Sequence, residues 1–153
     1  MNKEQKVLLH AENHCTANGT RLTAKRKLVL SGLLRSNKAL SAYDLIEYCQ
    51  QEFGETFQAM SVYRILEFLE DEHLVHKLKL ANKYVACSHI SCEHEHAVPQ
   101  FLICGKCDKV KEISIDKSLI DEFQSNVDDA GFQLISPQFE MNCICKKCLK
   151  HAG

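Results

Sequence analysis

The sequence predicts an α+β protein in which a winged helix-turn-helix unit precedes a small α/β unit. Helical segments with apolar stripes fill the first part of the chain and end in a predicted hairpin. Runs of β-branched and aromatic residues then surround a single helical segment. Seven of the nine cysteines lie from residue 87 onward. We therefore divide the chain into 1–86 and 87–153, with a hinge at about 80–96.

The first two predicted helices are bounded by short turn signals. Residues 3–17 form an amphipathic segment that stops near Gly19, a residue that commonly ends helices. Thr23 has the position of an N-cap for the next helix, residues 24–36. The predicted apolar side of this helix consists of Leu28, Leu30, Leu33 and Leu34.

The third and fourth predicted helices complete the helical part. Ser41 and Asp44 have capping-box spacing before residues 43–53. In residues 61–72, apolar residues recur at helical spacing, so one stripe faces a core while Tyr63 and Arg64 point elsewhere. This stripe is Val62, Ile65, Leu66 and Leu69.

The remaining elements are mostly strands. Residues 73–80 and 83–87 read as a hairpin with its turn at Ala81-Asn82, the order expected of a winged helix. Further strands are predicted in 100–104, 109–115 and 132–142, with a helix over 116–131 that ends at Gly131. We expect an antiparallel or mixed sheet, an arrangement common in dimerisation domains.

Positive charge is concentrated in one segment, although the chain as a whole has no excess of it. Lys and Arg number 19 against 20 Asp and Glu, so the formal net charge is −1. Between residues 21 and 38, however, basic residues occur without any acidic one, and they could bind DNA phosphates or form an ordinary solvated helix face. This cluster is Arg21, Lys25, Arg26, Lys27, Arg35 and Lys38.

The chain is expected to be soluble and cytoplasmic. Its N-terminal residues lack the apolar run of a signal peptide, and no segment approaches the roughly 20 apolar residues of a membrane span. In the reducing cytosol, nine cysteines indicate metal binding more than disulfides.

Two C-x-x-C pairs predict a zinc site. Cys104 with Cys107 and Cys145 with Cys148 can each present two thiolates from a tight turn, and two such turns form a tetrahedral sulfur cage. A redox dithiol and independent buried thiols are the alternatives. Cys143 extends the second motif, so it could replace Cys145 as a ligand.

More potential ligands lie between the two halves. Cys87, His89, Cys92, His94 and His96 crowd the region before the first C-x-x-C pair. His76 precedes them and Glu112 follows. A second metal site drawn from this set would link the helical and sheet parts, where metal occupancy could set the angle between them. The alternative is a polar linker with solvated histidines.

The order of motifs resembles the ferric uptake regulator family, and more closely its zinc-sensing branch, the zinc uptake regulators. The matching segments are "RLTAKR", "SAYDLIEY", "SVYRILEFLEDEHLVHK", "YVAC", the histidines, "CGKCDKVKE" and the last cysteine pair. They run from about Leu8 to Cys148. The resemblance implies a homodimeric, metal-dependent repressor with an N-terminal winged-helix DNA-binding domain and a C-terminal dimerisation domain.

The resemblance also assigns roles to individual residues. It implies that Cys104, Cys107, Cys145 and Cys148 bind structural zinc. It implies a sensing site of His76, Cys87, Glu112 and one histidine, for which we choose His96 over His94. Residues that correspond to the DNA-contacting positions are Tyr43, Ser61, Tyr63 and Arg64, and Lys25 and Arg26 become expected DNA contacts. Ala24 stands where the family often has proline.

We therefore expect a repressor of zinc-uptake genes that binds operator DNA with one structural and one regulatory zinc per chain. A thiolate in the sensing site favours zinc over iron or manganese. An iron- or peroxide-responsive regulator and a zinc storage or delivery protein are the alternatives. An enzyme is not expected, because the sequence lacks H-E-x-x-H, a Gly-rich phosphate loop and a nucleophile elbow. No small-molecule substrate or membrane partner is expected.

Overall fold

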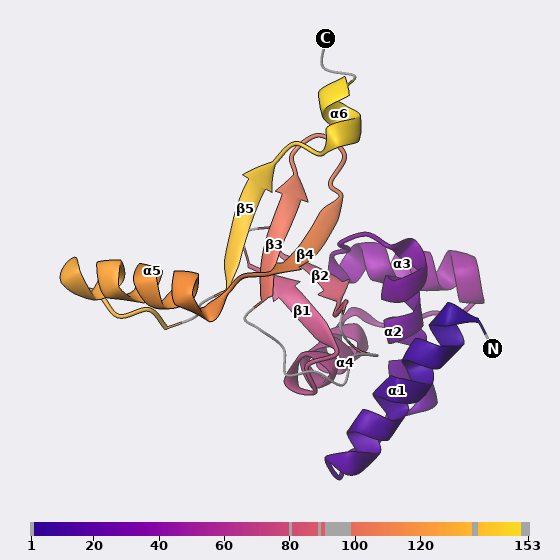
Figure 1. Ribbon diagram of the computed structural model, residues 1–153. Helices are drawn as coiled ribbons and strands as arrows, with labels where there is room; N and C mark the ends of the chain where they lie inside the picture. Colours follow the sequence, from indigo (N-terminus) through magenta and orange to yellow (C-terminus); the bar gives the residue numbers. More distant parts are fainter. Residues whose placement is uncertain (1, 80, 89, 91–98, 136–137, 151–153) are drawn as a thin grey trace. The chain divides into compact units, whose positions relative to one another are not determined.

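A computed structural model describes residues 2–79, 81–88, 90, 99–135 and 138–150. The chain divides into two compact units, Met1–Cys92 and Glu93–Gly153. Within the described residues, the first unit contains α1 to α4 and a two-stranded sheet, and the second contains a three-stranded sheet with α5 and α6 (Figure 1). None of the described helices has the length and apolar character needed to cross a bilayer.

The first two helices of the first unit begin where the sequence predicts, the third begins one residue earlier and the fourth two residues earlier. They are α1 (Lys3–Ala17), α2 (Ala24–Ser36), α3 (Ala42–Phe53) and α4 (Ala59–Asp71). The Thr23 side chain caps α2 by accepting a hydrogen bond from the Arg26 amide at 3.4 Å. Ser41 and Asp44 form the predicted capping box of α3, with distances of 3.1 and 3.4 Å. These hydrogen bonds satisfy amides that have no partner inside the helix.

The core of the first unit forms where the apolar stripes meet. All four predicted stripe residues of α4 are buried, as is Leu30 of α2. The predicted face of α2 is partly wrong, because Leu28 and Leu34 are only half-buried while Val29 is fully buried. The reason is that α2 contacts α1, α3 and α4, so its buried surface is wider than one stripe.

Gly32 is the point of close approach between α2 and α3. A Cβ atom at this position would lie 3.1 Å from Leu45 Cδ1 and 3.2 Å from Cys49 Sγ. The absence of a side chain on α2 therefore sets the spacing between the two helices.

The predicted hairpin closes the first unit. Strands β1 (Val75–Leu78) and β2 (Lys83–Ala86) pair antiparallel, and the turn between them contains Ala81 and Asn82 as predicted. Leu40, in the loop between α2 and α3, exchanges two backbone hydrogen bonds with Tyr84 of β2, at 3.0 and 2.8 Å. The hairpin is thus joined to the helical layer, which gives a winged helix-turn-helix unit.

A buried carboxylate attaches the end of α1 to the end of α4. Glu72, the C-cap of α4, is 8% exposed and accepts hydrogen bonds from Asn18 and Thr20, both at 3.0 Å. His14 Nε2 lies 3.7 Å from the same carboxylate. The Asn18 and Thr20 bonds lower the pKa of Glu72 more than burial raises it. Glu72 could not be singled out from local sequence patterns, because its hydrogen-bond partners lie more than fifty residues away.

The second unit is built on a mixed three-stranded sheet. Its elements are β3 (Pro99–Cys104), β4 (Val110–Ser114), α5 (Lys117–Asp129), β5 (Phe139–Cys143) and α6 (Lys146–Lys150). The strand order is β4-β3-β5, with β4 antiparallel and β5 parallel to β3. The Phe123 and Phe139 rings lie 5.3 Å apart between centroids, so α5 packs against the start of β5.

The last strand is shorter than the sequence predicts. The prediction of strand structure across 132–142 is wrong for residues 132–135, and β5 begins only at Phe139. Phe132 donates its amide to the Val127 carbonyl at 3.1 Å, so the chain is still leaving α5 at this point. Phe132 and Ile135 are 73% and 94% exposed, and their apolar character therefore does not reflect burial in the sheet.

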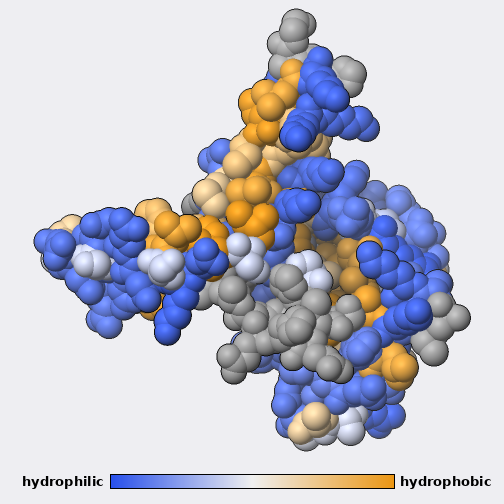
Figure 2. Space-filling model, viewed as in Figure 1, coloured by the Kyte–Doolittle hydropathy of each residue, from blue (hydrophilic) through white to orange (hydrophobic). Residues whose placement is uncertain are grey.

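The second unit leaves much apolar surface exposed. Figure 2 shows hydrophobic residues at its surface over the β5 and α6 region and on one side of α5. Seven large apolar side chains are exposed here: Leu119, Phe123, Phe132, Ile135, Met141, Ile144 and Leu149. Only Ile120 of α5 is buried. Such a concentration of apolar surface is typical of a protein–protein contact.

The Glu72 contacts predict a pH-dependent loss of stability. Glu72→Gln should lower the free energy of unfolding by about 1–3 kcal/mol at neutral pH, because Asn18 and Thr20 lose a charged acceptor. The folded pKa of Glu72 is below its ordinary value, so this contribution is present above about pH 5 and is lost as the pH falls through the folded pKa.

The measurement is urea unfolding of the full chain at several pH values. The difference between parent and Glu72→Gln should shrink as the solution is acidified from about pH 7 to about pH 4. Glu67→Gln, an exposed carboxylate on the same helix, is the matched control and should remain close to the parent. A pH-independent difference would contradict the assignment.

Candidate functional site

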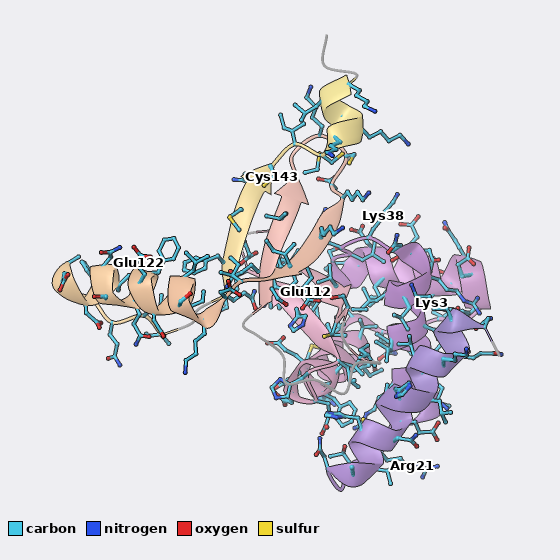
Figure 3. All side chains as sticks on the ribbon, in the orientation of Figure 1. Lys3, Arg21, Lys38, Glu112, Glu122 and Cys143 are labelled. Carbon is cyan, nitrogen blue, oxygen red and sulfur yellow. The ribbon has the colours of Figure 1, made fainter. Side chains whose placement is uncertain are left out.

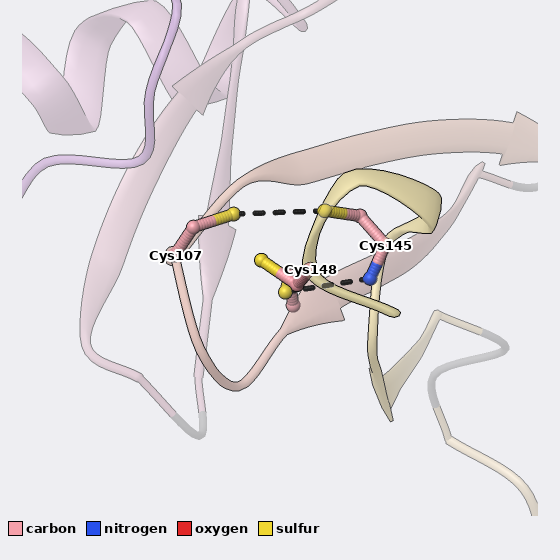
Figure 4. Close-up of side chains that lie close together, drawn as sticks. Cys107, Cys145 and Cys148 are labelled. Atoms are coloured by element: carbon pink, nitrogen blue, oxygen red, sulfur yellow. Dashed lines mark hydrogen bonds between the residues drawn. The ribbon is translucent and has the colours of Figure 1, made fainter. Parts of the chain in front are cut away.

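The two C-x-x-C motifs meet at one end of the sheet of the second unit. Cys104 is the last residue of β3 and Cys143 the last of β5, and the two are paired in register. Because β3 and β5 run parallel, the turns that follow them emerge at the same end. Figure 4 shows Cys107 from the first turn opposite Cys145 and Cys148 from the second.

The four thiols are close enough to share one ion. The sulfur atoms of Cys104, Cys107, Cys145 and Cys148 all lie within 4.8 Å of one another. Cys107 and Cys145 are 3.8 Å apart between sulfurs, which is too long for a disulfide. Zn–S bonds of about 2.3 Å in a tetrahedron place the sulfurs about 3.8 Å apart. The donor set and its spacing therefore fit zinc.

Backbone amides make one of these sulfurs acidic. The Cys145 amide donates to Cys104 Sγ at 3.4 Å, and this bond, with others from the amides of Cys107 and Lys106, lowers the pKa of Cys104 to about 6. The pKa of Cys148 is raised to about 12, first because its thiol hydrogen-bonds to Cys145. The cluster thus favours a thiolate at Cys104, and metal binding requires the other thiols to release their protons.

Cys143 is outside this group of sulfurs. Its backbone carbonyl accepts a hydrogen bond from the Gly105 amide at 3.0 Å, and Figure 3 shows the residue on β5. The structure therefore brings Cys145, rather than Cys143, together with Cys104, Cys107 and Cys148.

His76 and Cys87 lie side by side in the first unit. His76 of β1 pairs with Val85, and Cys87 follows two residues later on the same face. The Cys87 amide donates to the Leu74 carbonyl at 2.9 Å, which extends the hairpin by one step. Potential ligand atoms of His76 and Cys87 lie within 4.8 Å of each other.

The remaining predicted ligands of the second site belong to other segments of the sequence. Glu112 is on β4 of the second unit and pairs with Phe101 of β3. His96 and its alternative His94 lie outside the described residues, as do His89 and Cys92 of the same crowded segment.

Five of the six predicted DNA-contacting residues are exposed, and they lie on three helices. Tyr43 is in the first turn of α3 and is 67% exposed. Ser61, Tyr63 and Arg64 are exposed in the first two turns of α4. Lys25 is exposed near the start of α2.

Arg26 is engaged within the fold. Its Nη1 donates to the Arg21 carbonyl at 2.8 Å, and its guanidinium carbon lies 3.8 Å from the centre of the Phe68 ring. A cation–π contact of this kind joins the start of α2 to α4. The expected phosphate contact of Arg26 would compete with these interactions.

Part of the basic cluster is neutralised by α1. Lys27 forms an ion pair with Glu12 at 3.1 Å, and Arg35 with Glu4 at 2.8 Å. Both carboxylates come from outside the 21–38 window, so local charge counting did not find them. Arg21, Lys25 and Lys38 remain exposed.

Comparisons with known proteins agree with a chain that has a winged helix in one unit and a four-cysteine cluster in the other. The sequence pattern of the ferric uptake regulator family matches residues 17–148. The zinc uptake regulation protein of Escherichia coli (strain K12) is 32% identical over 146 residues, which is 95% of this chain and 83% of that protein.

Two solved structures resemble the whole chain. A zinc uptake regulator complexed with zinc and DNA has a TM-score of 0.84 and 28% identity, and the match covers 99% of this chain and 98% of that one. The holo form of XcZur has a TM-score of 0.76 and 31% identity, covering 94% and 96%. A winged helix-turn-helix unit, a second unit with four clustered cysteines, and these matches together show that the chain belongs to the ferric uptake regulator family.

Proposed function

We propose that the protein is a zinc-responsive transcriptional repressor that binds operator DNA as a homodimer and represses zinc-uptake genes. The observation that carries this proposal is the four-cysteine cluster in a chain that also contains a winged helix with exposed Tyr63 and Arg64. The similarity to a zinc uptake regulator complexed with zinc and DNA supports it. Such a repressor acts on the chromosome, so we place it in the cytoplasm.

The cysteine cluster would hold the structural zinc. Cys104, Cys107, Cys145 and Cys148 supply four sulfur ligands, and a site with four protein ligands leaves no open position for a reacting water. When bound, zinc would cross-link the two turns. Its binding free energy would then add to the stability of the folded unit. A closed site of this kind differs from a catalytic zinc site, which keeps an open position for water, and a storage protein would not require a winged helix.

We assign the regulatory zinc to His76, Cys87, Glu112 and His96. The proximity of His76 to Cys87 supports the part of this site that lies on the hairpin. One thiolate, two imidazoles and one carboxylate suit zinc better than iron or manganese, which prefer nitrogen and oxygen ligands. This favours a zinc sensor over an iron- or peroxide-responsive regulator. The cofactor content would then be one structural and one regulatory zinc per chain.

The ligands of the regulatory site come from both sides of the proposed boundary between 1–86 and 87–153. Drawing these ligands together restricts the hinge at about 80–96, and the recognition helices of a dimer then favour the spacing that DNA requires. A coupling of about 1–3 kcal/mol changes operator affinity by about 5- to 150-fold.

The second unit provides the surface for dimerisation. Its seven exposed large apolar side chains would be covered by a second copy of the chain. A homodimer matches the two-fold symmetry of a palindromic operator. Double-stranded operator DNA and a second copy of this chain are the proposed partners, with no small-molecule substrate and no membrane.

Loss of a sulfur ligand should remove the structural zinc and the dimer together. In Cys104→Ser and Cys148→Ser, the cluster can no longer offer four thiolates, so the second unit loses binding energy that stabilises its fold. The measurements are bound zinc and sedimentation of protein purified without added metal. Cys143→Ser is the matched control and should retain both. A stable zinc-free dimer of Cys104→Ser at about micromolar concentration would contradict the assignment.

Arg64 and Lys25 should affect DNA binding differently. Arg64→Ala should weaken operator binding by about 5- to 150-fold and binding to unrelated DNA much less, because an arginine contact with a base edge contributes about 1–3 kcal/mol of discrimination. Lys25→Ala should weaken binding to all sequences and reduce the slope of log K against log salt by about one. The affinities of both variants for operator DNA and for unrelated DNA are measured by titration at several salt concentrations. An equal loss of specific and nonspecific binding in Arg64→Ala would make it a phosphate contact.

The sensing site should be separable from the structural one. Cys87→Ser and His96→Ala should keep a folded dimer with its sulfur-bound zinc but lose the zinc-dependent increase in operator affinity, because a lost ligand weakens the regulatory site alone. The measurement is zinc-titrated DNA binding under reducing conditions.

Cys92→Ser and His94→Ala are the matched controls for the sensing-site variants and should keep most of the response. A reversed result for His94 and His96 would move the histidine assignment by two residues. A normal response in all four variants would refute the sensing site.

A further inference from the structure

The exposed face of α4 carries one large aliphatic side chain. Met60, in the first turn, is 63% exposed, whereas the apolar residues on the opposite face are buried. Met60 precedes Arg64 by one helical turn, so the two side chains lie on the same face. Single exposed apolar residues are common on protein surfaces, so exposure alone assigns Met60 no role.

The charge distribution along α4 defines which end can approach DNA. The first acidic residue of the helix is Glu67, and Glu70 and Asp71 follow it near the C-terminal end. Arg64 is the basic residue of the N-terminal half. The acidic end would be repelled by phosphates, whereas the N-terminal end combines a positive side chain with the positive end of the helix dipole. Only the N-terminal half can therefore enter a groove favourably.

The first turn of α4 would then lie closest to the base edges. In helix-turn-helix proteins, the N-terminal residues of the recognition helix contact bases in the major groove. Ala59 has a short side chain and Ser61 a small polar one, so Met60 is the long side chain of this turn. Its unbranched, polarisable side chain can adapt to an apolar partner.

The major groove presents one apolar group, which is the C5-methyl of thymine. We propose that Met60 is a specificity-determining residue that contacts a thymine methyl group in each operator half-site. This inference rests on the proposed function. Beside the base contact of Arg64, it adds a preference for thymine that comes from an apolar contact.

The test compares thymine with deoxyuridine, which lacks the methyl group. The probe is the duplex that the zinc-loaded full chain selects from a random-sequence pool, remade with each symmetric pair of thymines replaced in turn. At one such pair of positions, the affinity of the parent for the duplex should fall about four-fold for each half-site. This is the loss expected when one buried methyl group is removed. Met60→Ala should bind the thymine duplex more weakly than the parent does. Replacing the thymines at that position should not reduce the affinity of Met60→Ala further.

Two further variants control the comparison. Met60→Leu keeps an apolar side chain and should retain part of the discrimination. Leu9→Ala removes an exposed apolar residue of α1 and should show the parent's profile at every thymine. Met60 is exposed, so its variants are expected to fold, and circular dichroism checks this.

The inference is overturned if Met60→Ala shows the parent's uridine penalties at every position. If Arg64→Ala still loses operator binding in the same experiment, only the role of Met60 fails. If the parent selects no duplex in the presence of zinc, the proposed function fails and the role of Met60 fails with it.

Discussion

The parallel pairing of β3 and β5 is the constraint on which the metal cluster depends. Cys104 and Cys143 end their strands in register, so each C-x-x-C turn starts from the same end of the sheet. An antiparallel β5 would separate the turns by the length of a strand, about 17–20 Å. Parallel neighbours in turn require a crossover, and β4 and α5 supply it. The long segment between the two cysteine pairs is therefore needed to bring the two turns together.

The first unit uses several of its charged residues for its own construction. Glu12 and Glu4 of α1 neutralise Lys27 and Arg35, and Arg26 lies against Phe68. These contacts reduce the positive charge left for DNA phosphates, and in the proposed function recognition would depend more on side chains that distinguish bases. A protein with a net charge of −1 gains little from general attraction to nucleic acid, so in the proposed function selectivity would come from α4.

Features that depend on neighbouring residues were predictable from the sequence, and those that depend on distant pairs were not. The caps at Thr23 and Ser41, the stripe of α4 and the two C-x-x-C turns follow from local spacing. The ion pairs of α1, the contacts of Glu72 and the direction of β5 join segments that periodicity cannot connect. Phe132 and Ile135 resemble strand residues because they are apolar, although they are exposed.

The missing side chain at Gly32 has a consequence for sequence variation. Any larger residue would force Leu45 or Cys49 to shift by a few tenths of an ångström, and both belong to α3. Tyr43 is the second residue of the same helix, so a displacement of α3 would also move this exposed aromatic ring. A substitution at this interior position would therefore act on the exposed surface of α3 as well as on the packing of the core.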